Sequence, residues 1–111
     1  MWRRLLARWI ARPAPVPLRL YTKPGCHLCD EMKREIARAR CTVPVELVEV
    51  NIERDPELAE RHGRSIPVLE IAGRVAFKGR LEAAELEKKL ARRLSELRSE
   101  ASAGARESRH G

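Results

Sequence analysis

The residue types most able to do chemistry in this chain are two cysteines, Cys26 and Cys29, in the run C-H-L-C. Thiols at this spacing on a helix lie within one turn and can interconvert between a dithiol and a disulfide. The pair follows a Lys-Pro-Gly turn at 23–25 and opens a segment, 30–40, with a helical pattern. Free N–H groups at a helix N-terminus stabilise a thiolate. The spacing therefore predicts thiol–disulfide exchange rather than structural cysteines.

The two cysteines are expected to have different roles. Cys26 stands first, where the helix N-terminus can lower a thiol pKa from about 8.5 into the range of about 3.5 to 7.5, so it is predicted to attack. Cys29, one turn deeper, is predicted to resolve the mixed disulfide. His27 has two open interpretations, a cation that favours the thiolate or an exposed ring with little effect. Cys41 lies outside the pair and is expected to act as a small buried hydrophobic residue.

Hydrophobic periodicity predicts the elements that must position these thiols. The expected order is strand 18–22, helix 26–40, strand 45–50, short helix 55–62 ended by Gly63, strand 66–71, strand 75–78 and helix 81–97. A β-α-β start gives a parallel, right-handed unit, and the last two strands are expected to form a hairpin. The predicted fold class is α/β, β-α-β-α-β-β-α, with a four-stranded mixed sheet flanked by helices.

Length and charge narrow the classes of function. The chain has 111 residues, which suits one domain, and a net charge of +7. The charge lies at the ends, because residues 1–20 carry five arginines and no acid, while residues 21–91 are balanced. The middle therefore lacks the basic footprint of a nucleic-acid-binding domain, and no nucleic-acid partner is expected. No apolar run approaches the ~18 residues of a membrane span. Three cysteines do not make a disulfide scaffold, so a cytoplasmic location is expected.

The two ends are expected to lie outside the folded domain. Residues 1–12 form a basic amphipathic pattern with two tryptophans, which suits weak contact with a membrane surface or is an extension without a role of its own. Alternating prolines at 13, 15 and 17 predict a linker. The expected division is an extension and linker at 1–17, a domain at 18–98, and a disordered tail at 99–111.

Three segments together point to a family. The runs Y-T-K-P-G-C-H-L-C-D at 21–30, S-I-P-V-L at 65–69 and G-R at 79–80 resemble the glutaredoxin-like proteins of the thioredoxin fold. The likeness covers about residues 18–91. It implies a thioredoxin-like, glutaredoxin-type fold and a dithiol oxidoreductase that reduces protein or glutathione disulfides.

The resemblance gives Pro67 and Ile66 roles at the site. The matching proline of that fold is cis and lies beside the thiols, which implies a catalytic position for Pro67. A cis X–Pro bond is rare, about 5–6% of such bonds in folded proteins. Beside it, Ile66 can offer its backbone to an extended substrate, as in β-strand addition. The alternative is a trans proline that simply begins a strand.

The resemblance also implies a substrate-binding set. Lys23 matches a basic position that contacts the glycine carboxylate of glutathione, with a solvated turn lysine as the alternative. Gly79, Arg80 and Glu82 stand where glutaredoxins carry Gly-Gly and an aspartate that hold the γ-glutamyl end. Arg80 replaces the second glycine, and it can either pair with a carboxylate or block close approach.

No tightly bound cofactor is expected, and the reductant is either glutathione or an enzyme of the thioredoxin-reductase type. One alternative is a metal-binding module, with zinc or an iron–sulfur cluster held by Cys26, Cys29, Cys41 and His62. C-x-x-C metal sites usually have a second close pair, which this chain lacks, so no metal ligands are predicted. A further alternative keeps the thiols only for scaffolding or partner recruitment.

Overall fold

The computed structural model describes residues 14–110, with side chains to residue 103, so the predicted amphipathic segment 1–12 lies outside the described residues. The elements are β1 (Val16–Thr22), α2 (His27–Arg38), β2 (Val45–Asn51), the 3-10 turn η1 (Ile52–Arg54), α3 (Pro56–His62), β3 (Val68–Ile71), β4 (Arg74–Lys78) and α4 (Ala83–His110). This order confirms the predicted α/β class. In the described part of the chain, no helix has the length and apolarity needed to cross a membrane.

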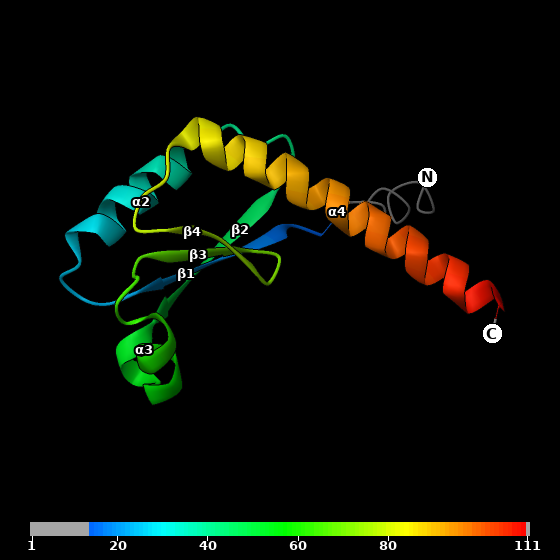
Figure 1. The fold of residues 1–111 in the computed structure, drawn as a ribbon. Coiled ribbons are helices and arrows are strands. Elements are labelled where there is room, and N and C mark those ends of the chain that lie inside the picture. Colours follow the sequence, from blue (N-terminus) through cyan, green and yellow to red (C-terminus); the bar gives the residue numbers. More distant parts are fainter. Residues whose placement is uncertain (1–13, 111) are drawn as a thin grey trace, which may run out of the picture.

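The four strands form one mixed sheet in the order β2-β1-β3-β4. β1 pairs in parallel with β2, as a β-α-β unit requires. β3 is antiparallel to both β1 and β4. Helices α2 and α4 cover one face of the sheet and α3 lies on the other, as Figure 1 shows. The predicted four-stranded mixed sheet with flanking helices is therefore confirmed.

Strand alternation sorts the apolar side chains into two clusters. Leu18 and Leu20 face α2 and α4, whereas Tyr21 faces α3. Burying a leucine stabilises the fold by about 1.5–3 kcal/mol, so the larger cluster dominates. Its fully or largely buried members are Leu18, Leu20, Met32, Ile36, Leu69, Ile71, Phe77, Leu81, Leu86 and Leu90. The smaller cluster under α3 consists of Tyr21, Ile52 and Val68.

The first strand begins earlier than predicted. Val16 and Pro17 belong to β1, although the sequence pattern placed them in a linker. The Val16 N–H donates to the Pro44 carbonyl at 2.9 Å, and the Pro17 carbonyl accepts from the Ala72 N–H at 2.9 Å. Proline lacks only the N–H, so it still contributes an acceptor to the sheet. The first strand therefore starts two residues before the predicted Leu18.

The last helix is longer than predicted. α4 begins at Ala83 rather than Leu81 and continues to His110, so the predicted helix end near Leu97 is wrong. No proline interrupts the stretch after Leu97. Two ion pairs add support there, since Glu100 lies 3.6 Å from both Arg74 and Arg93. In Figure 1 the helix runs well beyond the sheet.

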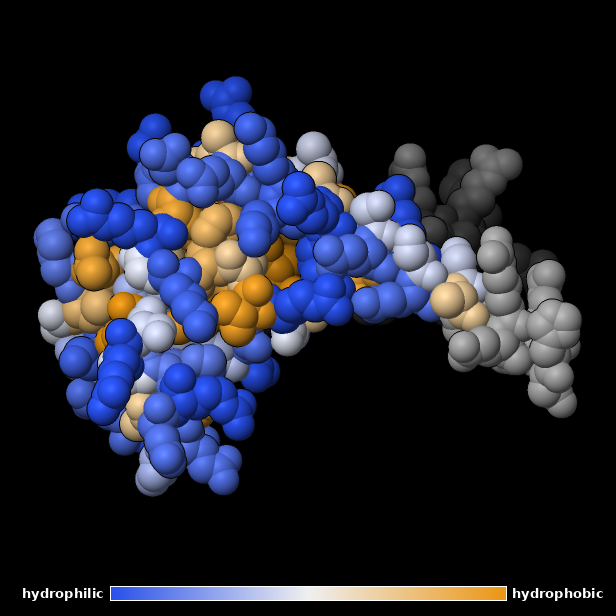
Figure 2. Space-filling view, viewed as in Figure 1, coloured by the Kyte–Doolittle hydropathy of each residue, from blue (hydrophilic) through white to orange (hydrophobic). Residues whose placement is uncertain are grey.

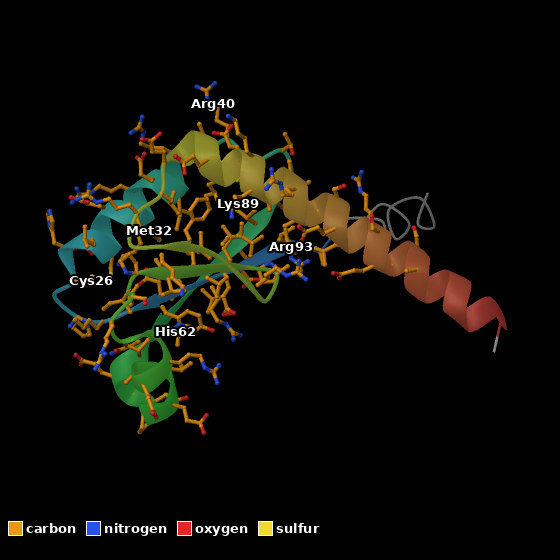
Figure 3. All side chains as sticks on the ribbon, viewed as in Figure 1. Cys26, Met32, Arg40, His62, Lys89 and Arg93 are labelled. Atoms are coloured by element: carbon orange, nitrogen blue, oxygen red, sulfur yellow. A yellow bond between two sulfur atoms is a disulfide. The ribbon has the colours of Figure 1, made fainter. Side chains whose placement is uncertain are left out.

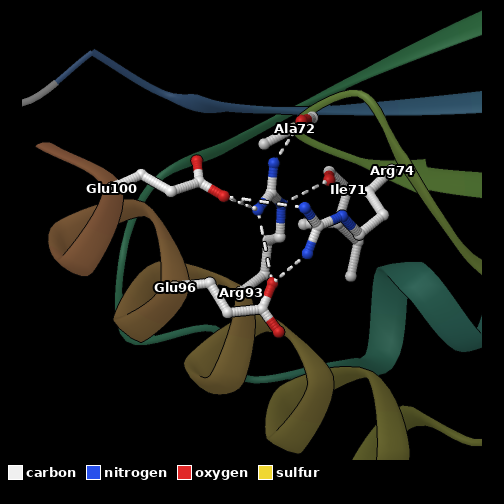
Figure 4. Close-up of polar contacts among 6 residues, drawn as sticks. All are labelled: Ile71, Ala72, Arg74, Arg93, Glu96 and Glu100. Carbon is white, nitrogen blue, oxygen red and sulfur yellow. Dashed lines mark hydrogen bonds and ion pairs between the residues drawn. The ribbon is translucent and has the colours of Figure 1, made fainter. Parts of the chain in front are cut away.

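An arginine fastens α4 to the turn between β3 and β4 (Figure 4). Arg93 donates from Nε to the Ile71 carbonyl at 3.3 Å and from Nη2 to the Ala72 carbonyl at 3.0 Å. Its Nη1 also lies 3.3 Å from Glu96. Only 12% of the Arg93 side chain is exposed. Because the guanidinium satisfies two turn carbonyls and a carboxylate together, it holds α4 against the sheet.

Candidate active site

The strand register brings three distant loops to one end of the sheet. Tyr21, near the end of β1, pairs with Val68 at the start of β3, and Val68 pairs with Lys78 at the end of β4. The segment before α2, the segment before β3 and the segment before α4 therefore leave the sheet at the same end. These segments carry the cysteine pair, Pro67 and Gly79.

The cysteine pair sits where the helix begins. Cys26 and Cys29 are joined by a disulfide, with their Cα atoms 5.2 Å apart. Cys26 is the N-cap of α2, and its Sγ accepts a hydrogen bond from the Cys29 N–H at 3.2 Å. An N-cap position aims free N–H groups at the sulfur and stabilises its negative charge. Cys29 is 2% exposed and Cys26 is half-buried, which fits an outer attacking sulfur and an inner resolving one.

The residues between the cysteines face solvent. His27 and Leu28 are exposed, and Leu28 exposes 37% of its surface. The His27 Nε2 lies 3.2 Å from the Glu31 carboxylate one turn along α2. When His27 is protonated, this neighbour offsets part of its charge. Leu28 instead presents an apolar surface beside the thiols. Gly25, just before the pair, has a φ of 75°, which an L side chain rarely adopts.

Pro67 has the geometry that the family resemblance implies. The Ile66–Pro67 peptide bond is cis. Pro67 is fully buried, and its carbonyl accepts from the Gly79 N–H at 2.8 Å, which ties the segment before β3 to the segment before α4. Ile66 is half-buried and packs against the smaller cluster. The strand itself starts at Val68, two residues after the predicted start.

A pocket of about 270 Å³ lies beside the cysteine pair. One wall comes from α2 and the other from the segment that leads into α4. The pocket brings together the predicted residues Gly79, Arg80 and Glu82, whereas Lys23 is exposed and does not line it. The lining residues are Leu28, Glu31, Met32, Glu35, Gly79, Arg80, Leu81, Glu82 and Glu85.

Three of the pocket's acidic residues, Glu31, Glu35 and Glu85, were not among the predicted site residues. Glu35 reaches across from α2, and its Oε1 accepts from the Ala83 N–H at 3.4 Å, close to the start of α4. The sequence could show only that Glu31 and Glu35 share a helix face, because the facing wall comes from a segment more than 40 positions away. With four glutamates and one arginine, the pocket is net acidic.

The other two residues of the alternative metal-ligand set, Cys41 and His62, lie away from the cysteine pair. Cys41 packs against the larger cluster, where burial and then the charge of Glu87 raise its pKa. His62 lies under the opposite face and stacks on the Tyr21 ring at 4.4 Å between centroids. Figure 3 shows Cys26 at the start of α2 and His62 at α3. Among the side chains that the structure describes, at residues 14–103, no three His, Cys, Asp or Glu residues form a group able to hold a metal ion. The structure therefore does not assemble the alternative ligand set.

A polar pair supports the strand that leads to the thiols. The Tyr21 hydroxyl donates to the Glu70 carboxylate on the neighbouring strand β3. Burial, followed by the bond to Glu70, raises the pKa of Tyr21. Because Tyr21 is one residue from the end of β1, this bond fixes the strand close to the loop that carries Cys26.

Two comparisons with known proteins agree with this geometry. The family model described as Glutaredoxin-like domain (DUF836) matches residues 17–91. The X-ray structure of XcR50, a structural genomics target protein from X. campestris, is similar, with a TM-score of 0.58 and 32% sequence identity. That match covers 67% of this chain and 95% of the other. The family match contains both cysteines, Pro67 and every residue of the pocket.

Proposed function

The chain belongs to the glutaredoxin-like domain family, and from that premise we propose that it is a dithiol oxidoreductase that reduces disulfides through Cys26 and Cys29. The family and the cysteine pair support a thiol redox role. The observation that carries the finer proposal is the position of Cys26 as the N-cap of α2, within disulfide reach of a buried Cys29.

The proposed reaction proceeds in two exchanges. In the reduced protein, the Cys26 thiolate attacks one sulfur of the substrate disulfide and expels the other as a thiolate, which gives a mixed disulfide. The Cys29 thiolate then attacks the Cys26 sulfur, releases the second substrate thiol and closes the Cys26–Cys29 disulfide. The substrate gains two electrons and the protein loses two. A thiol or flavoenzyme reductant must then return the pair to the dithiol.

The pocket bears on the choice between glutathione and protein substrates. Glutathione carries two carboxylates and one amine, whereas the pocket carries four glutamates around Arg80. Like charges at close range disfavour binding, although exposure weakens the effect. We therefore propose protein disulfides as the main substrates. Leu28 and the backbone of Ile66 would contact the extended segment around the substrate disulfide.

Single-cysteine variants test the proposed reaction. Full-length parent, Cys26→Ser, Cys29→Ser and Cys41→Ser would be compared for reduction of a fluorogenic peptide disulfide, with intact mass measured in parallel. We expect Cys26→Ser to abolish turnover and Cys29→Ser to accumulate a mixed disulfide, because the resolving sulfur is missing. Cys41→Ser is the matched control and should keep the rate within about twofold, since Cys41 is remote from the pair. Turnover by Cys26→Ser, or loss of turnover in Cys41→Ser, would contradict the proposal.

A second comparison tests the reductant. The oxidised parent would be mixed with glutathione, or with a thioredoxin-reductase-type enzyme and its nicotinamide cofactor, and free thiols would be counted over time. The acidic pocket predicts slow reduction by glutathione. The double variant Glu31→Gln/Glu82→Gln should accelerate the glutathione reaction while leaving the flavoenzyme reaction unchanged. Rapid reduction of the parent by glutathione alone would show that the pocket charge does not select against it.

A further inference from the structure

The edge of the sheet formed by β4 is open. β4 lies at the end of the strand order and pairs only with β3. The Gly79 N–H points to Pro67 on the β3 side, so the N–H of Lys78, one residue earlier, points away from the sheet. The Lys78 carbonyl accepts from the Arg80 N–H at 3.0 Å, whereas an outward N–H such as that of Lys78 can pair with another extended chain.

A groove runs between this edge and α4. Two adjoining hollows of about 150 and 200 Å³ share Lys89 and Arg92 as lining residues. The apolar part of the lining consists of Ile71, Val75, Ala76 and Phe77. Figure 2 shows apolar side chains gathered near the middle of this face, bordered by hydrophilic ones. Val75 exposes 43% of its surface, so the edge strand offers apolar contact to a neighbouring chain.

The border of the groove is basic, and its charge is not neutralised within the described part of the chain. Three exposed cations of α4 line it, namely Lys88, Lys89 and Arg92. None of the three takes part in an ion pair with another side chain of residues 14–103, whereas Arg74 and Arg93 pair with Glu96 and Glu100. Glu85 is the remaining acid on this border. Lys89 also lies over the Phe77 ring, 5.6 Å from its centroid, above the apolar lining.

We propose that β4 and the groove beside α4 bind an extended acidic segment of a partner protein as an added strand. The open backbone edge would supply hydrogen bonds, and the apolar lining would take alternate side chains. The three cations would attract acidic side chains at the border and set the specificity. A second copy pairing through the same edge is disfavoured, because it would bring two basic borders together. This inference stands independently of the proposed redox activity.

Charge variants of the full chain test the surface. The probe is a fluorescein-labelled peptide of about eight alternating valine and glutamate residues, a length that spans a typical strand. Its binding to the protein is measured by fluorescence anisotropy. We expect saturable binding to the parent. Lys89→Glu/Arg92→Glu should weaken it at least about tenfold, because two attractions become repulsions. The matched control, Arg61→Glu/Arg64→Glu, makes the same charge change around α3 on the other face and should keep the affinity within about twofold.

Modified peptides separate strand addition from simple attraction. Two versions of the probe would be N-methylated at alternate residues. One version loses the backbone N–H donors along one edge of the peptide strand and the other loses those along the opposite edge, and neither changes the charge of the peptide. We expect one version to lose at least about tenfold in affinity and the other to bind like the parent probe. No saturable binding, equal loss in the two double variants, or equal binding by both methylated probes would overturn the proposal. A second copy of the chain on the β4 edge would also overturn the proposal. Such a copy could pair through its acidic edge strand β2, and it would be seen as self-association that Glu46→Lys/Glu49→Lys on β2 abolishes.

Discussion

Replacement of Arg93 by methionine should destabilise the fold strongly, because that side chain fixes α4 to the β3–β4 turn. Methionine keeps much of the apolar stem but removes the hydrogen bonds to the carbonyls of Ile71 and Ala72. Hydrogen bonds from a charged donor contribute about 1.5–3 kcal/mol, and partial access of water to the turn favours the lower end. Ion pairs with Glu96 and Glu100 are more exposed and add less than about 1 kcal/mol. The expected loss is about 2–4 kcal/mol.

That loss is large compared with a total stability of about 5–15 kcal/mol for a domain. The assay is urea unfolding followed by circular dichroism, with a reductant present throughout so that every variant has the same dithiol state. Arg92→Met is the matched control, because Arg92 neighbours Arg93 but is exposed and has no ion pair with a described side chain. It should cost less than about 0.5 kcal/mol. In thermal unfolding, Arg93→Met should lower Tm by roughly 10 °C or more.

The contrast between the two arginines decides the outcome. If Arg93→Met and Arg92→Met differ by less than about 0.5 kcal/mol, the hydrogen bonds from Arg93 do not hold α4 in place. Salt provides a second check. At about 1 M salt the ion-pair contribution should be screened, while most of the Arg93 effect should persist because carbonyl acceptors carry no net charge. A loss that vanishes in salt would refute the assigned role of the turn carbonyls.

Two further predictions follow from shifted pKa values. The pKa of Tyr21 is raised in the fold above its unfolded value of about 10, so its contribution to stability is complete below about pH 10 and is lost as pH rises above that value. Tyr21→Phe should therefore show a shallower alkaline decline in urea midpoint than the parent, and equal slopes would contradict the assignment to Tyr21. Burial raises the pKa of Cys41, so at about pH 7 the reduced protein should be alkylated by iodoacetamide at least about tenfold faster at Cys26 than at Cys41, measured by peptide mass spectrometry. Equal rates would remove the basis for treating Cys26 as the attacking sulfur.

The order and type of the elements could be predicted because local pattern and packing agree. Leu18 and Leu20 alternate with Arg19 along β1, and Met32 and Ile36 recur at helical spacing along α2. The four apolar side chains are buried in the larger cluster, which joins the sheet to α2 and α4. A pattern of period two or 3.6 already identifies the face that must be covered. The type and the buried face of these elements can therefore be predicted before it is known which other element packs against them.

The ends of elements could not be predicted, because they depend on distant partners. Pro17 looks like a linker residue locally, yet its carbonyl is used by Ala72. The sequence pattern ends the last helix near Leu97, yet Glu100 of α4 is placed to pair with Arg74 of another element. The lining of the pocket also depends on distant segments of the chain. Glu35 became a site residue only when the segment before α4 folded against α2.

The direction of β4 connects the proposed docking groove beside α4 with the cysteine pair and its pocket. The strand runs from Arg74 to Lys78, and Gly79 follows directly at the end of the sheet that carries Cys26 and Pro67. A partner segment added along β4 would cover the five residues of the strand, about 17 Å. One end of that segment would then lie next to the pocket walled by Gly79 and Leu28. A disulfide a few residues beyond the acidic segment would be held near Cys26. Docking at the edge would thus raise the local concentration of the disulfide, an effect that depends on the length of the intervening chain and requires no change at the thiols.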